Sequence, residues 1–584
     1  MKNTSKNILF CSLAFLILLF SSCETVDLDG LKNDNEKGSE LSDPVYGFNY
    51  VQVVLADFVN NANNITQDLT RQYAMTSGKT YDNAFEPVNS NDIWISAYSI
   101  LGTIKSYESK AIANNQFELL GASKIVKAYV MFSLVDLFGD VPYSEALLGN
   151  ENLNPAYDSG AIVYKKALAE LDEAIVLLDK PLNSTLVANR PYDLFYGTTA
   201  EKVLGKTNWK TLANTLKFRA YVTARKNNIA LGVNLNSELS VLMAGNLIDT
   251  PSEDFAFKYG IDDTTLPFSS RHPAFNNAYI RGFSPSYISN YMLWTMVREK
   301  PKLSTLPSQQ DLNLIDPRVP YYFYNQSSDV YANDTFTLPG KFASRPDHYN
   351  DPKYTSFYRA NRLTPYIFTR VSASSNTSAF WGSDHGNNAG RPQDGDKVTI
   401  VGVYPAGGKY GGGSSPQTDS GTAGEKGAGI MPIVMSSFTR FLKAEAYLTV
   451  FNDPILAKVE MDAGINASID KASKLFPSLP QPVPADVTAY QFFVDDFYNN
   501  NPSKQLEVIM KEFFIAAWGN GIETYNNYRR TGFPGNFQPT IELNSGAYYN
   551  TLLYPSDSQS NNSNRPPNFR SRRVFWDINS PILN

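Results

Sequence analysis

The sequence predicts a mainly α-helical protein, in which antiparallel helical pairs form a scaffold and a long loop-rich insert packs on it. In residues 44–245 and 433–584, apolar side chains recur at every third or fourth position, the period of a buried helix face. Residues 246–432 lose this period and are rich in Pro, Gly, Asn, Ser and Tyr. Their aromatic content is too high for a linker, so we expect one packed layer over the helices.

The most apolar stretch, Ser123–Tyr143, is predicted to be the central helix. It is apolar on nearly every side, which is typical of a helix buried among other helices. Gly139 can end it in a left-handed conformation, and Pro142 cannot continue it. We therefore expect the other helices to be arranged around this one.

Helical spacing predicts further helices on both sides of the insert. They are expected at 45–63, 93–114, 157–179, 208–227 and 231–244, and again at 436–451, 468–476, 486–498 and 503–534. Asn208 and Ser503 are the expected N-caps of two of them. Within the insert, Lys397–Tyr404 is the best strand candidate, and the Gly-rich stretch Tyr404–Gly429 is interpreted as a mobile connection.

The amino terminus has the features of a targeting segment. Residues 1–22 begin with a basic region and continue with the apolar run Ile8–Phe20, which is too short to span a bilayer. Two serines then precede Cys23, as in a lipoprotein cleavage site, so Cys23 is the expected lipidation site; an ordinary secretory peptide cut nearby is the alternative. Residues 23–43 are acidic and polar, which predicts a flexible tether.

Composition and motifs exclude several functional classes. The net charge is −6 and no basic run alternates with aromatic residues, so we expect no nucleic-acid partner. The three His residues, His272, His348 and His385, are not spaced as helical metal ligands, and Asp394–Asp396 lacks the other ligands of a calcium loop. We expect no metal and no cofactor.

No catalytic residue stands out either. The only cysteine besides Cys23 is Cys11, inside the signal segment, so a processed chain would have no thiol catalyst and no disulfide. No G-x-S-x-G elbow occurs. We therefore expect a protein that is not an enzyme, although 57 acidic residues leave room for the carboxylate pair of a glycosidase.

Five segments, in order along the chain, resemble the SusD/RagB family, the surface lipoproteins that serve nutrient-import systems of Bacteroidetes. They are Leu137–Tyr143 (LFGDVPY), Trp209–Arg219, Arg440–Leu448, Glu512 together with Arg529–Pro534, and Tyr554–Asp557. In the last segment, Asp557 stands where members commonly have Glu. Most of these residues fall on predicted helices, so we expect them to maintain the scaffold.

The resemblance implies TPR-like helical pairs and a lipid-anchored protein of the outer membrane that faces the cell exterior. Such a protein captures a glycan or other oligomer and delivers it to a SusC-like TonB-dependent transporter. Peptide capture is an alternative within the same family. A surface-anchored glycoside hydrolase is the alternative from a different class.

Sugar binding needs aromatic rings for the C–H faces of the sugar and polar groups for its hydroxyls. Two loop stretches have this mixture, Arg71–Asn91 and Tyr354–His385. Trp381 is the sharpest candidate because small residues flank it, although it could equally be a buried anchor of the insert. The candidate ligand-binding residues are Tyr73, Tyr81, Tyr358, Arg359, Trp381, Asp384 and His385, and the first stretch also contains Asp82 and Phe85.

Overall fold

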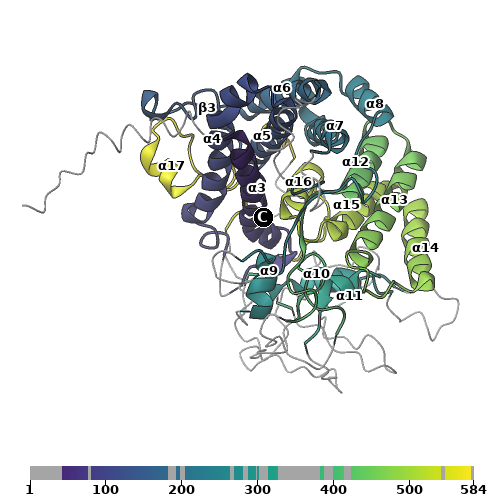
Figure 1. Ribbon diagram of the computed structural model, residues 1–584. Coiled ribbons are helices and arrows are strands. Elements are labelled where there is room, and N and C mark those ends of the chain that lie inside the picture. Colours follow the sequence, from purple (N-terminus) through teal and green to yellow (C-terminus); the bar gives the residue numbers. More distant parts are fainter. Residues whose placement is uncertain are drawn as a thin grey trace, which may run out of the picture.

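The computed structural model of the chain is mainly helical, as the sequence predicts (Figure 1). It describes residues 43–76, 80–181, 193–197, 204–262, 269–280, 287–297, 299–301, 314–326, 382–383, 385–386, 399–412, 422–540 and 546–579. The described helices form an arc, and the described part of the insert lies against one side of it. Within these residues no helix is long and apolar enough to cross a membrane.

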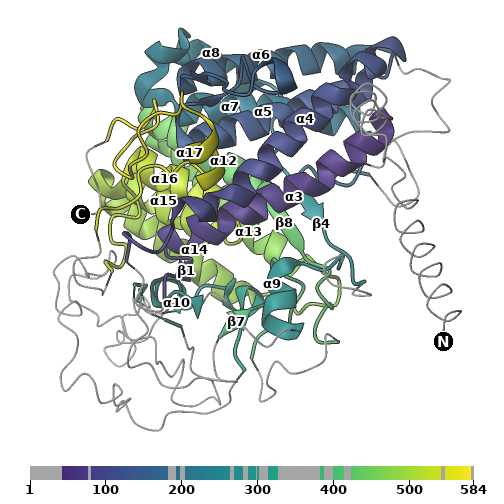
Figure 2. The ribbon, with the colours of Figure 1, turned by 90° about the vertical axis from the view of Figure 1, so that its left-hand side faces the viewer.

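The first half of the arc consists of helices joined in sequence order. They are α3 (Pro44–Leu69), α4 (Asn91–Ala113), α5 (Phe117–Phe138), α6 (Gly160–Asp179), α7 (Lys206–Thr223) and α8 (Leu235–Ala244). The short helices η1 (Pro87–Ser90), η2 (Gly149–Glu151) and η4 (Arg225–Leu231) lie between them. Gly121 lies against Leu178 and Asp136 bonds to Tyr164, so α5 and α6 are antiparallel neighbours (Figure 2).

Helix α5 is the predicted central helix. Nearly all of its residues are buried, and it contacts α3, α4, α6, α7 and α16. It ends at Gly139, whose φ of 83° lies in the region that favours glycine. The helix α7, by contrast, begins three residues earlier than predicted: its N-cap is Gly205, and Asn208 lies inside the helix.

The second half of the arc follows the insert. It contains α12 (Ser436–Thr449), α13 (Pro454–Ser473), α14 (Pro484–Asn500), η9 (Pro502–Lys504), α15 (Gln505–Ala516), α16 (Gly521–Thr531) and α17 (Ser556–Asn561). The helix predicted at 468–476 is only the end of α13, which begins at Pro454 because the Asp453 side chain caps it there.

The helix predicted at 503–534 is two helices. Gly519 has a φ of 91°, which stops α15, and Asn520 then caps α16 by accepting a hydrogen bond from Glu523 N at 3.0 Å. The Asn520 amide also donates to Pro432 O and Ile433 O, which ties the break to strand β8. Ser503 is therefore not an N-cap; it lies in η9.

The described strands form short antiparallel pairs, and two of them, the first and the third in the following order, connect the insert to the scaffold. They are β1 (Tyr73–Ala74) with β5 (Tyr287–Ile288), β2 (Val141–Pro142) with β3 (Tyr157–Asp158), β4 (Phe255–Lys258) with β8 (Ile430–Val434), and β6 (Phe323–Tyr324) with β7 (Ile400–Val401). The described helices of the insert are α9 (Pro273–Phe275), the π turn η5 (Asn276–Ile280), α10 (Asn290–Val297) and α11 (Val319–Tyr322). The strand predicted at Lys397–Tyr404 contains β7.

The Gly-rich stretch is not a mobile connection where the structure describes it. Tyr404 and Ala406 are buried. A Cβ at Gly429 would lie 2.1 Å from Pro405 O, so the backbone approaches itself too closely for any side chain. These glycines permit dense packing.

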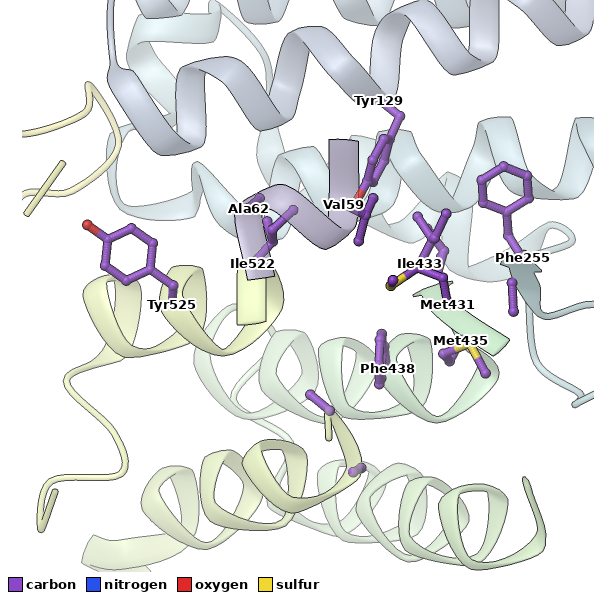
Figure 3. Close-up of a cluster of buried hydrophobic side chains, with 14 of the residues drawn as sticks. Val59, Ala62, Tyr129, Phe255, Met431, Ile433, Met435, Phe438, Ile522 and Tyr525 are labelled. Atoms are coloured by element: carbon purple, nitrogen blue, oxygen red, sulfur yellow. The ribbon is translucent and has the colours of Figure 1, made fainter. Parts of the chain in front are cut away.

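One hydrophobic core joins the scaffold and the insert strands (Figure 3). Val59 of α3, Tyr129 of α5 and Phe438 of α12 lie around Met431 and Ile433 of β8. Because β4 and β8 contribute to this core, the position of the described insert is fixed by the same apolar burial that holds the helices.

Charged residues of the family-like segments lie inside the scaffold. The Arg530 guanidinium of α16 donates two hydrogen bonds, at 2.8 and 2.7 Å, to the Glu445 carboxylate of α12, and Arg225 pairs with the same carboxylate at 2.7 Å. Burial alone would raise the pKa of Glu445, but the two guanidinium groups outweigh it and lower the pKa. Glu445 is thus a buried anion held by two helices.

Two further buried ion-pair groups involve residues of the family-like segments. Glu512 of α15 accepts from Arg318 at 3.1 Å and lies 3.2 Å from Lys300 Nζ. Arg219 of α7 pairs with Glu523 of α16 and with Asp136 at 3.3 Å. These residues maintain the scaffold, which agrees with the expectation from their helical positions.

Candidate ligand-binding site

The structure brings together two of the predicted ligand residues, Tyr81 and His385. Their ring centroids are 5.9 Å apart, and the Arg71 guanidinium donates to Tyr81 Oη at 2.6 Å. His385 N donates to Gln538 Oε1 at 3.1 Å. Burial, with the nearby Arg71, lowers the pKa of His385, so its imidazole is neutral. The two predicted loop stretches therefore meet, but at a point where protein covers both rings.

The loop in front of this cluster is attached to the C-terminal segment. Arg570 donates to the Asp82 carboxylate and to the Tyr81 backbone carbonyl. Tyr549 Oη donates to Phe85 O at 2.9 Å, and the Arg570 guanidinium lies over the Tyr549 ring at 5.5 Å. The loop and the C-terminal segment are thus held as one surface.

A groove of about 360 Å³ opens on this surface, and we call it the Asp82 groove. Its lining combines rings, a carboxylate, a guanidinium and an amide: Asp82, Phe85, Glu86, Pro87, Ala547, Tyr549, Leu553, Asn568, Phe569, Arg570 and Ser571. The Phe569 side chain is 50 % exposed. The volume is in the range of small-molecule sites, and the mixture is the one expected for a sugar.

Tyr73 lies elsewhere. It lines a smaller cavity of about 120 Å³, where its ring stands 5.2 Å from that of Trp518 and the polar face of α3 contributes Asn60 and Asn64. Four other predicted ligand residues lie outside the described residues, as does the proposed lipidation site Cys23. These four are Tyr358, Arg359, Trp381 and Asp384.

Comparison with protein families adds a decisive observation. A family model described as "Starch-binding associating with outer membrane", SusD-like_2, matches residues 36–364 and 388–555, most of the chain. The chain belongs to this SusD-like family. The fold and the family expected from the five sequence segments are confirmed, and no curated protein sequence matches the chain.

Solved structures share the SusD-like fold at low identity. A chitin-binding SusD homologue from Flavobacterium johnsoniae is 17 % identical, with a TM-score of 0.60 over 92 % of this chain and 98 % of that one. A SusD/RagB family protein from Bacteroides thetaiotaomicron is 16 % identical, with a TM-score of 0.57 over 91 % and 99 %. A Bacteroidetes SusD-like protein is 15 % identical, with a TM-score of 0.64 over 92 % and 100 %.

The sequence predicts only the loop side of the groove of this SusD-like chain, which supplies four of its eleven lining residues. Tyr549, Phe569 and Arg570 come from the C-terminal segment, in which only the Tyr554–Asp557 stretch matches a family pattern. A signal was present, because residues 546–571 combine Tyr, Phe, Arg and Asn without helical spacing, like the two predicted stretches. Nothing in the sequence indicated that this segment would meet Asp82.

The groove also contains two carboxylates, Asp82 and Glu86. Glycoside hydrolysis uses a carboxylate pair across the scissile bond, so this is the arrangement to test for catalysis. Asp82 accepts a hydrogen bond from the Arg570 guanidinium. In the described part of the chain, no three His, Cys, Asp or Glu side chains gather so that they could hold a metal ion.

Proposed function

We propose that this SusD-like protein captures a glycan in the Asp82 groove and delivers it to a TonB-dependent transporter of the outer membrane. The observation that carries the proposal is the exposed Phe569 ring beside the Asp82–Arg570 pair in an open groove, which the buried Tyr549 ring supports from below. The description of the family as starch-binding supports a carbohydrate ligand, and the chitin-binding neighbour adds a second polymer to test.

Binding would use the groove as it stands. The exposed Phe569 ring offers a flat apolar face to the C–H side of a sugar. Asp82 and Arg570 remain in contact with water, so their charges can exchange hydrating water for sugar hydroxyls at low cost. No bond in the ligand needs to break, because capture requires only placed rings and satisfied polar groups.

Anchoring would make modest affinity sufficient. Acylation of Cys23 at the outer face of the membrane, followed by the tether 23–43, would hold the groove beside the transporter. A tethered binder presents its ligand at a high effective concentration to a neighbouring pore. We also propose that residues 44–584 form one domain, in which residues 246–432 are an insert in the helical scaffold.

The experiment is a calorimetric titration of residues 23–584 with Cys23→Ser. The ligands are maltooligosaccharides, chitooligosaccharides, and acidic and neutral peptides. We expect binding to one glycan class, and an Asp82→Ala variant that binds it at least several-fold more weakly. Asp557→Ala is the control, an exposed aspartate on α17 outside the groove. Binding only to peptides, or glycan binding equal in both variants, would reject the glycan site.

A hydrolase is the second candidate because Asp82 and Glu86 border the same groove. Incubation with the bound oligosaccharide, followed by detection of new reducing ends, decides between the two. The capture proposal expects none. Cleavage that disappears in Glu86→Gln would establish the hydrolase instead.

A further inference from the structure

Among the described residues, strand β4 has a partner strand on one edge only, that of β8. Tyr259 N donates to Gly429 O at 2.9 Å, and Phe257 is in register with Met431 of β8. In an antiparallel ladder the residues between such pairs turn their backbone groups outward, here Ala256 and Lys258. Neither backbone has a hydrogen-bond partner in the described part of the chain. An edge of this kind is a template for a further strand.

A cavity of about 690 Å³ lies beside this edge, and we call it the β4-edge cavity. It shares no residue with the Asp82 groove. One wall is apolar and aromatic, and the rim carries ammonium groups. Its lining residues are Phe195, Tyr196, Pro251, Ser252, Asp254, Ala256, Lys258, Tyr259, Ala428, Gly429, Ile430, Asp470, Lys471, Lys474, Leu475 and Phe476.

The charge balance of the cavity favours an anionic occupant. Lys471 Nζ is neutralised by Asp254 at 2.8 Å, and Lys474 Nζ by Asp470 at 2.9 Å. Lys258 is exposed and has no carboxylate partner among the described residues. One net positive charge therefore remains. The occupant that fits both the strand edge and this charge is an extended acidic segment.

We propose that the occupant is residues 25–31 of the chain itself, added as a strand to the free edge of β4. In their sequence, Thr-Val-Asp-Leu-Asp-Gly-Leu, apolar and acidic residues alternate from Val26 to Asp29. This is the period of a strand with one apolar and one polar face. The aspartates would face the lysine rim, and Val26 and Leu28 would lie on the opposite face of the strand, against the Phe195 ring that packs on Phe255 and Phe257.

The length of the chain permits this docking. Leu194 N donates to Gln52 Oε1 of α3 at 2.9 Å, so the loop that supplies Phe195 to the cavity lies beside the first turns of that helix. The rise from Asp43 to Gln52 is about 14 Å. Residues 32–42, which remain between the docked segment and Asp43, can span about 36 Å when extended. The segment can therefore reach the cavity of its own molecule.

Docking would set the distance between the protein and its anchor. With residues 25–31 bound, Cys23 is held within two residues of the body; with them released, residues 24–43 allow a reach of about 66 Å. This consequence rests on the proposed lipidation of Cys23. The docking itself does not, and it is independent of the Asp82 groove.

The test is hydrogen–deuterium exchange of the chain without its signal segment, with Cys23→Ser. We expect the backbone amides of residues 26–29 to exchange about tenfold more slowly than in the free peptide of residues 24–36, equivalent to about 1.4 kcal/mol. Lys258→Glu and Leu28→Asp should each abolish the difference. Lys165→Glu is the matched control, an exposed lysine on α6.

Each other outcome overturns the proposal. Exchange at the free-peptide rate in the unmodified chain means that the segment does not dock. Protection that survives Lys258→Glu places the segment elsewhere. Protection that increases with protein concentration indicates exchange between two copies rather than docking within one chain. Glycan binding in all of these variants should equal that of the unmodified chain, which separates this proposal from that of the Asp82 groove.

Discussion

Two arginine–carboxylate pairs in this molecule have the same chemistry and different roles. Arg530 and Glu445 join α16 to α12 inside the scaffold, where their side chains are 1 % and 0 % exposed. Arg570 and Asp82 join two loops at the groove, where they are 25 % and 53 % exposed. Loss of one partner leaves an unpaired buried charge only in the scaffold. Access to water thus decides which pair provides stability and which is available to a ligand.

The largest expected effect is on the scaffold pair. Glu445→Ala leaves Arg225 and Arg530 buried without their anion, so we expect the free energy of unfolding to fall by about 3–5 kcal/mol. Urea denaturation followed by circular dichroism measures this free energy. If the variant does not fold, its loss of soluble yield relative to the unmodified chain is the readout. A loss below 1 kcal/mol would mean that this pair is no different from the one at the groove.

Tyr81 tests the boundary between the two regions. Tyr81→Phe removes the acceptor of Arg71 Nη2 in a buried site, so we expect a loss of about 1–3 kcal/mol in the free energy of unfolding. Glycan affinity should change little, because protein covers the ring. Lost affinity at unchanged stability would instead make Tyr81 a ligand contact.

Arg570→Ala should separate binding from stability. We expect the free energy of unfolding to change by about 1 kcal/mol or less, since the pair with Asp82 is exposed to solvent. Glycan binding should be lost, because the variant removes the guanidinium and, with it, the hydrogen bond that orients the Asp82 carboxylate. Parallel urea denaturation and calorimetry are the readouts. A destabilisation as large as that of Glu445→Ala would show that the groove pair contributes as much to stability as the buried scaffold pair.

The smallest effect concerns pH. Burial, with the neighbouring Asp495, raises the pKa of Asp462 on α13 to about 7, whereas the pKa of Glu445 is lowered. Between the ordinary pKa of Asp462 and pH 7 the folded chain binds more protons than the unfolded chain, so stability from this group falls as pH rises. Asp495→Asn should flatten the dependence between pH 5 and 7 in urea titrations. An unchanged slope would contradict the assignment.

The sequence was sufficient for features that depend on local patterns. Helix α5 could be predicted because it is apolar all round, and the scaffold role of Glu512, Arg529 and Arg530 followed from their helical positions. The break at Gly519 was missed because the helical period continues through it, and only the contact of Asn520 with β8 fixes the separation of α15 and α16.

The groove could be predicted only in part. Asp82 and Phe85 stood out as a polar and aromatic loop, but Arg570 is 488 residues away in the chain and only the fold brings it to Asp82. Tyr81 and His385 were predicted to contact the ligand, but both side chains are buried. A loop composition typical of binding sites does not distinguish the rings that face solvent from those that hold the loop in place.

The most direct test of the account compares two phenylalanines of similar exposure. Phe569 lines the groove and Phe492 lies on α14, and they are 50 % and 62 % exposed. Titration of Phe569→Ala and Phe492→Ala with the glycan that the unmodified chain binds should give about tenfold weaker affinity, about 1.4 kcal/mol, for the first variant only, at unchanged melting temperature. Equal affinity in the two variants would contradict the account.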